Sequence, residues 1–144
     1  MRKTLLLVIL LLGVVAVTAT ACGSDDDDSS PAAATSEGEI TAEEAAAEID
    51  EIKRMLDEGL EQYRSGDKEA ADTTVGDAYL EHFEKVEHPL EERDHEFMEE
   101  LEHRISTEIR DEMKNDAPAD EVATLVDETK ADLDKAKAML QEAE

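Results

Sequence analysis

The chain is poor in the residue types that support most cross-links and cofactor sites. Its 144 residues include one cysteine, no tryptophan, two tyrosines and two phenylalanines. A single cysteine excludes an intramolecular disulfide and a zinc site built on several thiolates. With so few aromatic rings, a folded core must consist mainly of aliphatic side chains and methionine.

Basic residues are also scarce. The chain has 14 Lys and Arg and 40 Asp and Glu, which gives a formal net charge of −26. Nucleic acid is excluded as a partner, since phosphate binding needs a basic surface. Anionic lipid head groups would be repelled as well. A surface of this kind attracts cations and basic proteins. Solubility or adaptation to high salt accounts for the same composition.

The one cysteine, Cys22, follows an N-terminal signal. Residues 1–3 are Met-Arg-Lys, residues 5–17 are apolar, and residues 18–21 are small. This order is typical of a signal peptide with its cleavage site. A cysteine after small residues is the acceptor of the bacterial lipoprotein pathway, in which its thiol takes a diacylglycerol and the new N-terminus is acylated. We therefore expect a lipid anchor at Cys22, on the outer face of the cytoplasmic membrane or in the periplasm.

Two alternatives are an ordinary secretory peptide with a stray cysteine and an uncleaved anchor, although a membrane span needs about 20 apolar residues. The predicted organisation is a signal peptide (1–21), the lipidated cysteine with an acidic flexible linker (22–39), and a helical domain (40–144). The signal holds Arg2 and Lys3 and no acid, so cleavage leaves 12 basic and 40 acidic side chains, a charge of −28.

From residue 40 onward apolar residues recur with a helical period, and no stretch alternates with period two. Thr41 and Glu44 form a capping box, Gly66 ends the first helix, and Asp67 and Asp94 suit the starts of the next two. Four amphipathic helices joined by short turns predict an all-α, antiparallel up-down-up-down four-helix bundle. The predicted buried stripes are Ala45, Ile49, Ile52, Leu56, Leu60 and Tyr63; Val75, Tyr79, Phe83, Val86 and Leu90; Met98, Leu101, Ile105, Ile109 and Met113; and Val122, Leu125, Val126, Thr129, Leu133, Ala136 and Leu140.

Three residues are expected to affect these helices locally. Gly76 weakens the second helix by about 1 kcal/mol relative to Ala. Pro89 kinks or ends that helix. Pro118 suits the first turn of the last helix.

Most acids point away from these stripes, but Glu102 lies only about 50° from the centre of the third one. Glu87 and His82 flank the second stripe, so all three side chains are expected near one seam between helices. A buried carboxylate is costly unless it is paired, hydrogen-bonded or bound to a metal. A salt bridge from Glu102 to a basic residue such as Lys53, or a side chain that reaches solvent, is the alternative.

Other chemistry has little support in the sequence. Glu92 with His95 and Glu100 with His103 match the Glu-x-x-His spacing of di-iron bundles, but both pairs lie on one helical segment rather than on facing helices. No phosphate loop, nucleophile elbow or His-Glu-x-x-His motif is present, so we expect no enzyme.

The run Ala78-Tyr79-Leu80-Glu-His-Phe83-Glu84-Lys-Val-Glu87-His-Pro-Leu90, with Tyr63-x-x-Gly66-Asp67 before it and Leu101-Glu102 after it, resembles a known family. It is similar to the extracytoplasmic helical domain that precedes the membrane part of bacterial high-affinity iron permeases. The resemblance spans roughly residues 49–140. It implies a polar set of Glu84, Glu87 and Glu102, with Arg110 as ion-pair partner. The permease's Arg-Glu-x-x-Glu motif is absent, so transport itself is not implied.

The expected function is therefore a membrane-anchored lipoprotein that assists iron uptake. It would bind iron or another divalent cation through Glu84, Glu87 and Glu102, with His82 and His88 as lesser candidates, or dock on an iron permease. The alternative is a structural or interaction lipoprotein whose acidic surface keeps it soluble and which has no metal role.

Overall fold

The structure, a computed structural model, describes residues 40–142. These residues form helices and turns without a strand, so the all-α prediction is confirmed for this part of the chain. The signal peptide, the lipidated Cys22 and the linker predicted for residues 22–39 lie outside the described residues.

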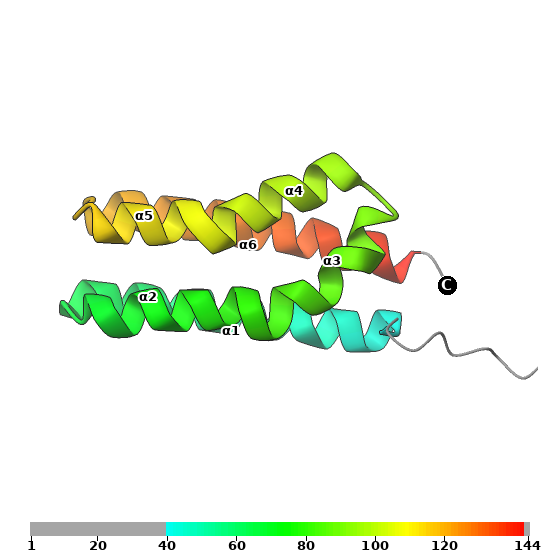
Figure 1. The fold of residues 1–144 in the computed structure, drawn as a ribbon, viewed down its shortest axis with the longest axis horizontal. Coiled ribbons are helices and arrows are strands. Elements are labelled where there is room, and N and C mark those ends of the chain that lie inside the picture. The colour runs from blue at the N-terminus through cyan, green and yellow to red at the C-terminus, as the bar shows by residue number, and fades with distance from the viewer. Residues whose placement is uncertain (1–39, 143–144) are drawn as a thin grey trace, which may run out of the picture. The chain divides into compact units, whose positions relative to one another are not determined.

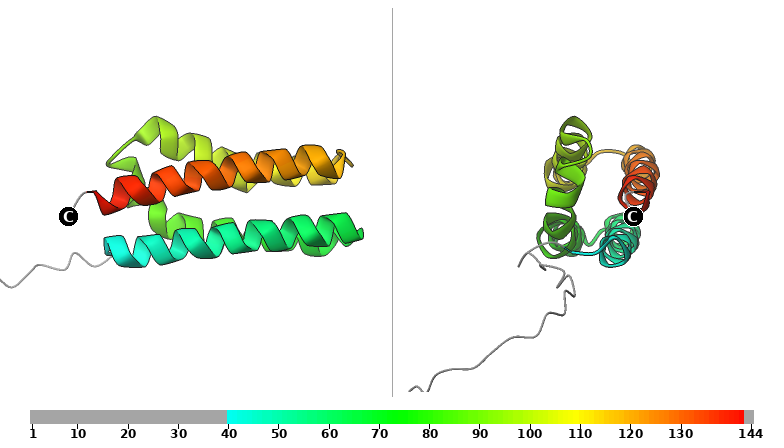
Figure 2. Two further views of the ribbon diagram at one scale, coloured as in Figure 1. Left: turned by 180° about the vertical axis from the view of Figure 1, so that it is seen from behind. Right: turned by 90° about the vertical axis from the view of Figure 1, so that its right-hand side faces the viewer.

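Three turns divide the described chain into four helical rods that lie side by side (Figures 1 and 2). The first rod is α1 (Ala42–Ser65) and the fourth is α6 (Ala119–Gln141). The second and third rods are each interrupted by a π-helical segment. The second comprises α2 (Lys68–Asp77), η1 (Ala78–Phe83) and α3 (Glu84–Glu91), and the third comprises α4 (His95–His103), η2 (Arg104–Glu108) and α5 (Ile109–Lys114).

The helix ends follow the capping residues that the sequence predicts. Thr41 Oγ1 accepts from the Glu44 N–H at 3.2 Å, and the Glu44 carboxylate accepts from the Thr41 N–H at 2.8 Å. Gly66 has φ 91°, the left-handed conformation that ends α1. The side chains of Asp67 and Asp94 cap α2 and α4. These predictions are confirmed.

Of the two proline predictions, the one for Pro118 needs adjustment. Pro118 is the N-cap of α6, one residue before the first helical position, and not part of the first turn. Pro89 lies inside α3, which continues to Glu91. Figure 1 shows that the second rod bends toward the third at α3, and both Pro89 within this helix and the π-helical η1 before it are features that bend helices.

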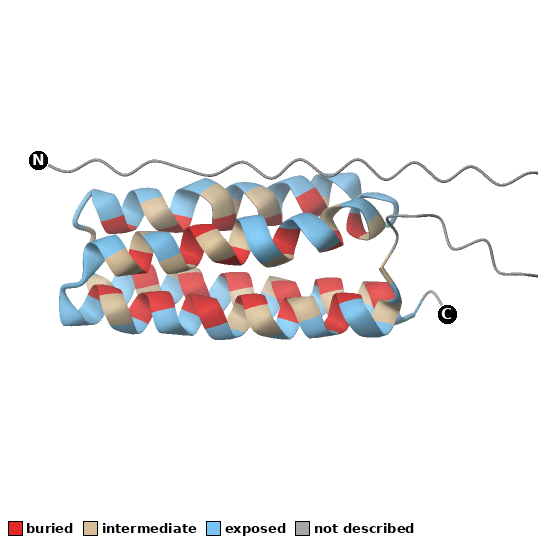
Figure 3. Ribbon diagram, turned by 60° about the horizontal axis from the view of Figure 1, so that its bottom comes forward, coloured by how far each residue is buried: buried red, intermediate tan, exposed pale blue. Residues whose placement is uncertain are grey.

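The predicted stripes form the core between the rods (Figure 3). Every residue of the four stripes is buried except Tyr79 and Leu125, which are partly buried. Small residues that the stripes did not include, among them Gly59, Ala71 and Ala78, are buried where rods approach closely.

A ladder of ion pairs joins the first and fourth rods. Asp50 pairs with Lys137, Lys53 with Asp134, and Asp57 with Lys130. Each step forward along α1 matches an equal step backward along α6, so the two helices run antiparallel in one fixed register.

Gly59 sets the distance between α1 and α2. A Cβ added to this glycine would lie 2.7 Å from Val75 Cγ2, which is closer than two carbons approach without a shift. The absence of a side chain at this position therefore lets the two helices pack closely.

Gly59→Ala should lower the free energy of unfolding by about 1–3 kcal/mol, because the clash outweighs the helix propensity that alanine adds. Adding Val75→Ala opens space for the new methyl group, so the two substitutions should cost less together than the sum of their separate effects. Urea unfolding of the two single variants and the double variant measures this coupling. If the effects of the two substitutions on the free energy of unfolding simply add, the contact between residues 59 and 75 does not determine the cost of Gly59→Ala.

Candidate functional site

Two of the predicted glutamates meet between the second and third rods. Tyr79 of η1 donates its hydroxyl to Glu102 Oε1 of α4 at 3.3 Å. Glu87, from α3, is near enough that its charge raises the pKa of Tyr79, and the charge of Glu102 in turn raises the pKa of Glu87. We call Tyr79, Glu87 and Glu102 the Tyr79 cluster.

The Tyr79 cluster holds negative charge away from solvent. The Oε1 atom of Glu87 is buried, and within residues 40–142 it has no hydrogen-bond partner. Burial, and then the charge of Glu102, raise the pKa of Glu87 above its usual value. Burial and the charges of both carboxylates raise the pKa of Tyr79 to about 12. Burial and like charge therefore make ionisation of Glu87 and of the phenol less favourable than in water.

Three other half-buried carboxylates, those of Asp72, Asp132 and Glu48, differ from this pair because each binds basic side chains. Arg110 and Lys114 bind Asp72, and the hydrogen bond from Arg110 lowers the pKa of that carboxyl. Arg104 and Lys135 bind Asp132.

The Glu48 carboxylate lies 2.9 Å from Lys85 Nζ and 2.6 Å from His82 Nδ1. Burial opposes the ionised form of Glu48, but these two hydrogen bonds bring its pKa below the usual value. Among the ion pairs of residues 40–142, none includes Glu87 or Glu102.

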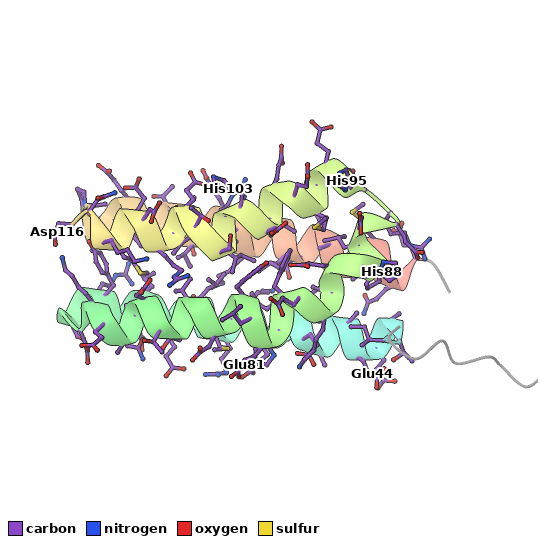
Figure 4. The ribbon with its side chains drawn as sticks, in the orientation of Figure 1. Glu44, Glu81, His88, His95, His103 and Asp116 are labelled. Carbon is purple, nitrogen blue, oxygen red and sulfur yellow. The ribbon has the colours of Figure 1, made fainter. Side chains whose placement is uncertain are left out.

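The remaining predicted site residues lie elsewhere. Glu84 is exposed on α3, one turn before Glu87, and contributes to the negative field at Glu87. His82 is turned toward Glu48 of α1. His88 is exposed near the outer end of α3 (Figure 4) and lies 3.9 Å from Glu92 Oε1.

Two expected ion pairs are replaced by others. Arg110, expected beside the three glutamates, instead binds Asp72, where its guanidinium packs over Gly76. Lys53, the alternative partner of Glu102, binds Asp134.

The two π-helical segments position the Tyr79 cluster. Tyr79 is the second residue of η1, and Glu102 lies two residues before η2. The wider π turns change the direction of side chains along each rod, and such segments are frequent at functional sites. Arg110 also donates to the Ser106 carbonyl of η2 at 3.3 Å, so it ties this segment to Asp72 of α2.

Tyr79 is the member of the cluster that sequence reasoning assigned to packing alone. The available signal was a tyrosine within an otherwise apolar stripe, since a buried hydroxyl needs a partner. The π-helical segments had no such signal in the sequence.

Within residues 40–142, no three His, Cys, Asp or Glu side chains gather closely enough to hold a metal ion. The Glu-x-x-His pairs do not form such a group, and Figure 4 places His95 and His103 on the outer side of α4. No helix in the described part is both long enough and apolar enough to cross a membrane. No protein-family model, curated protein or solved structure matches this chain.

The raised pKa of Glu87 predicts a pH-dependent cost in stability. Its folded-state pKa lies above the unfolded value, so the protonated form stabilises the fold below pH 4.5, and that contribution is lost as the pH rises through the folded-state pKa. Glu87→Gln should therefore raise the free energy of unfolding at neutral pH by about 1 kcal/mol. The gain should vanish well below pH 4.5.

Urea unfolding at both pH values, in a metal-free buffer, measures the effect. Glu84→Gln is the matched control, because it removes the same charge from an exposed position on the same helix. Equal effects of the two substitutions at neutral pH would mean that only the net charge matters.

Proposed function

We propose that this chain is a membrane-anchored extracytoplasmic lipoprotein that assists iron uptake by binding a metal cation between Glu87 and Glu102. In this proposal residues 40–144 form an antiparallel up-down-up-down four-helix bundle, held at the outer face of the cytoplasmic membrane or in the periplasm by the lipid on Cys22. The observation that carries it is that Glu87 and Glu102 are two half-buried carboxylates that influence each other, and that no ion pair of residues 40–142 includes either one, although Glu48, Asp72 and Asp132 are paired with basic residues.

The chemistry of the pair supports a hard cation. Iron, manganese, calcium and magnesium ions bind carboxylate oxygens more readily than soft metal ions do. A bound cation would offset the negative charge that burial and Glu102 make unfavourable at Glu87, and would satisfy its buried Oε1 atom. Glu84 adds negative potential at the approach to the pair and completes the predicted acidic set.

The resemblance of residues 49–140 to the outer domain of iron permeases supports the physiological role. A lipid anchor would keep the chain beside the membrane, where it could dock on a separate permease. The rival function is a structural or interaction lipoprotein that uses its acidic surface to stay soluble or to bind a basic partner.

Titration of the purified full chain with iron by calorimetry tests cation binding. The triple variant Glu84→Gln, Glu87→Gln and Glu102→Gln should lose at least about 1.4 kcal/mol of binding free energy, a tenfold weaker affinity, because it removes the proposed ligands. The wild-type chain should bind with saturation.

A second triple variant, Glu96→Gln, Glu99→Gln and Glu100→Gln, controls for charge, because it neutralises three exposed acids of α4. This variant should retain the wild-type affinity. If both triple variants weaken binding equally, iron is held by diffuse surface charge. Unchanged affinity in the first variant would exclude the proposed pair.

A further inference from the structure

Arg110 joins the second and third rods close to the π-helical segments. From α5 its Nε donates to Asp72 Oδ1 of α2 at 2.7 Å, and its Nη1 donates to the Ser106 carbonyl of η2 at 3.3 Å. Its guanidinium carbon lies 3.4 Å from the position that a Cβ of Gly76 would take. We call these two hydrogen bonds the Arg110 bridge. The bridge connects the backbone of one rod to a side chain of the other.

The Ser106 carbonyl belongs to the wide turn of the third rod. In η2 the N–H of Ile109 bonds to the carbonyl of Arg104, which is five residues back instead of four. Such turns are rare, and a side chain that inserts into the backbone hydrogen-bond ladder is a recognised cause of departure from regular α-helix. Because the Arg110 guanidinium bonds to a carbonyl in the middle of this turn, it stabilises the turn in its wide form.

The second rod has a matching wide turn beside it. In η1 the N–H of Glu84 bonds to the Tyr79 carbonyl, again five residues back, and η1 contacts η2. The Tyr79 hydroxyl donates to Glu102 of the third rod, two residues before η2. A change in the number of residues in a turn rotates the side chains before it relative to those after it. The direction of Glu102 therefore depends on the form of η2.

A second cation at Asp72 allows the bridge to open. Lys114 Nζ lies 3.2 Å from Asp72 Oδ1, the same oxygen that accepts from Arg110. When Arg110 releases this oxygen, the carboxylate keeps Lys114, and the partly exposed guanidinium returns to water. Opening the bridge therefore leaves no buried charge without a partner, which is the main cost of breaking a buried ion pair.

We infer that the Arg110 bridge is a conformational latch for η2. In the closed state it holds the wide turn and keeps Glu102 within hydrogen-bond reach of Tyr79. In the open state η2 relaxes and the hydrogen bond between Tyr79 and Glu102 is lost. Asp72 thereby controls a contact made elsewhere between the two rods, through a segment that has two arrangements. The latch operates in the chain alone, so it does not rest on cation binding.

Hydrogen exchange of backbone amides, followed by NMR on the full chain in metal-free buffer, tests the latch. Arg110→Lys keeps a positive charge beside Asp72 but lacks the planar fork that bonds Asp72 and the Ser106 carbonyl together. Exchange at residues 104–109 should accelerate about tenfold, as expected for the loss of one hydrogen bond, while exchange in α1 should change less than about twofold. Asp72→Asn loosens the bridge from its other end and should act in the same direction.

Arg104→Lys is the matched control. Arg104 belongs to η2 itself and pairs with Asp132 of α6 at 2.6 Å, on the side of the fourth rod. This variant also exchanges a guanidinium for an ammonium group but leaves the Arg110 bridge in place. Exchange at residues 104–109 should therefore stay within about twofold of the wild-type rate.

A double-mutant cycle tests the second step of the inference. Urea unfolding of Tyr79→Phe, Glu102→Gln and the double variant measures the coupling between these two side chains. The same cycle is repeated in the Arg110→Lys and Arg104→Lys backgrounds. The coupling should be lost in the first background and retained in the second.

Faster exchange confined to residues 104–109 in Arg110→Lys, together with loss of the coupling, supports the latch. Equal acceleration in all rods, or in both arginine variants, shows that Arg110 contributes only to overall stability and overturns the inference. Unchanged exchange at residues 104–109 overturns it as well. Coupling that survives in Arg110→Lys overturns the control of the contact between Tyr79 and Glu102. Iron is absent from every measurement, so these results are independent of the proposed function.

Discussion

The structure depends on where a very acidic chain places its few positive charges. After the predicted signal peptide, 12 basic side chains face 40 acidic ones, so self-repulsion opposes any compact state. Most of the available cations lie at seams between rods, as in the α1–α6 ladder, the Arg110–Asp72 pair and the Glu48 pairs. Ion pairs at these positions link rods that would otherwise repel one another, while the aliphatic stripes supply the buried apolar surface.

Glu87 and Glu102 differ from these paired acids, because no ion pair of residues 40–142 includes either of them. If Glu87 and Glu102 served only the fold, an arginine between them would remove their repulsion, as Arg110 does for Asp72. The chain instead retains a buried, unpartnered oxygen and a phenol whose pKa is raised to about 12. The cation of the proposed function would relieve this local cost in stability.

Much of the helical architecture could be predicted from local sequence, because each rod carries its own apolar stripe and its own cap. Thr41, Gly66, Asp67 and Asp94 act within one turn of the chain, so their roles are readable without tertiary information. Glu102 and Glu87 were found because their angles place them at the edge of an apolar stripe.

The sequence does not indicate which charged residues pair with one another in the fold. Arg110 lies near the glutamates in helical order, but Gly76 leaves room for its guanidinium on α2, where Asp72 binds it. The π-helical segments depend on packing between rods, and they turn Tyr79 into the cluster. Both features depend on the distance between helices, and the apolar stripe of a single helix carries no information about that distance.

The equal-step register of α1 and α6 has a mechanical consequence. The ladder places the beginning of α1 beside the end of α6, and Figure 2 shows these two helix ends on the same side of the rods. A pull applied at Ile40 along the axis of α1 would load the three ion pairs and the apolar seam together, in shear. The first helix would then resist tension as a unit and would not separate turn by turn.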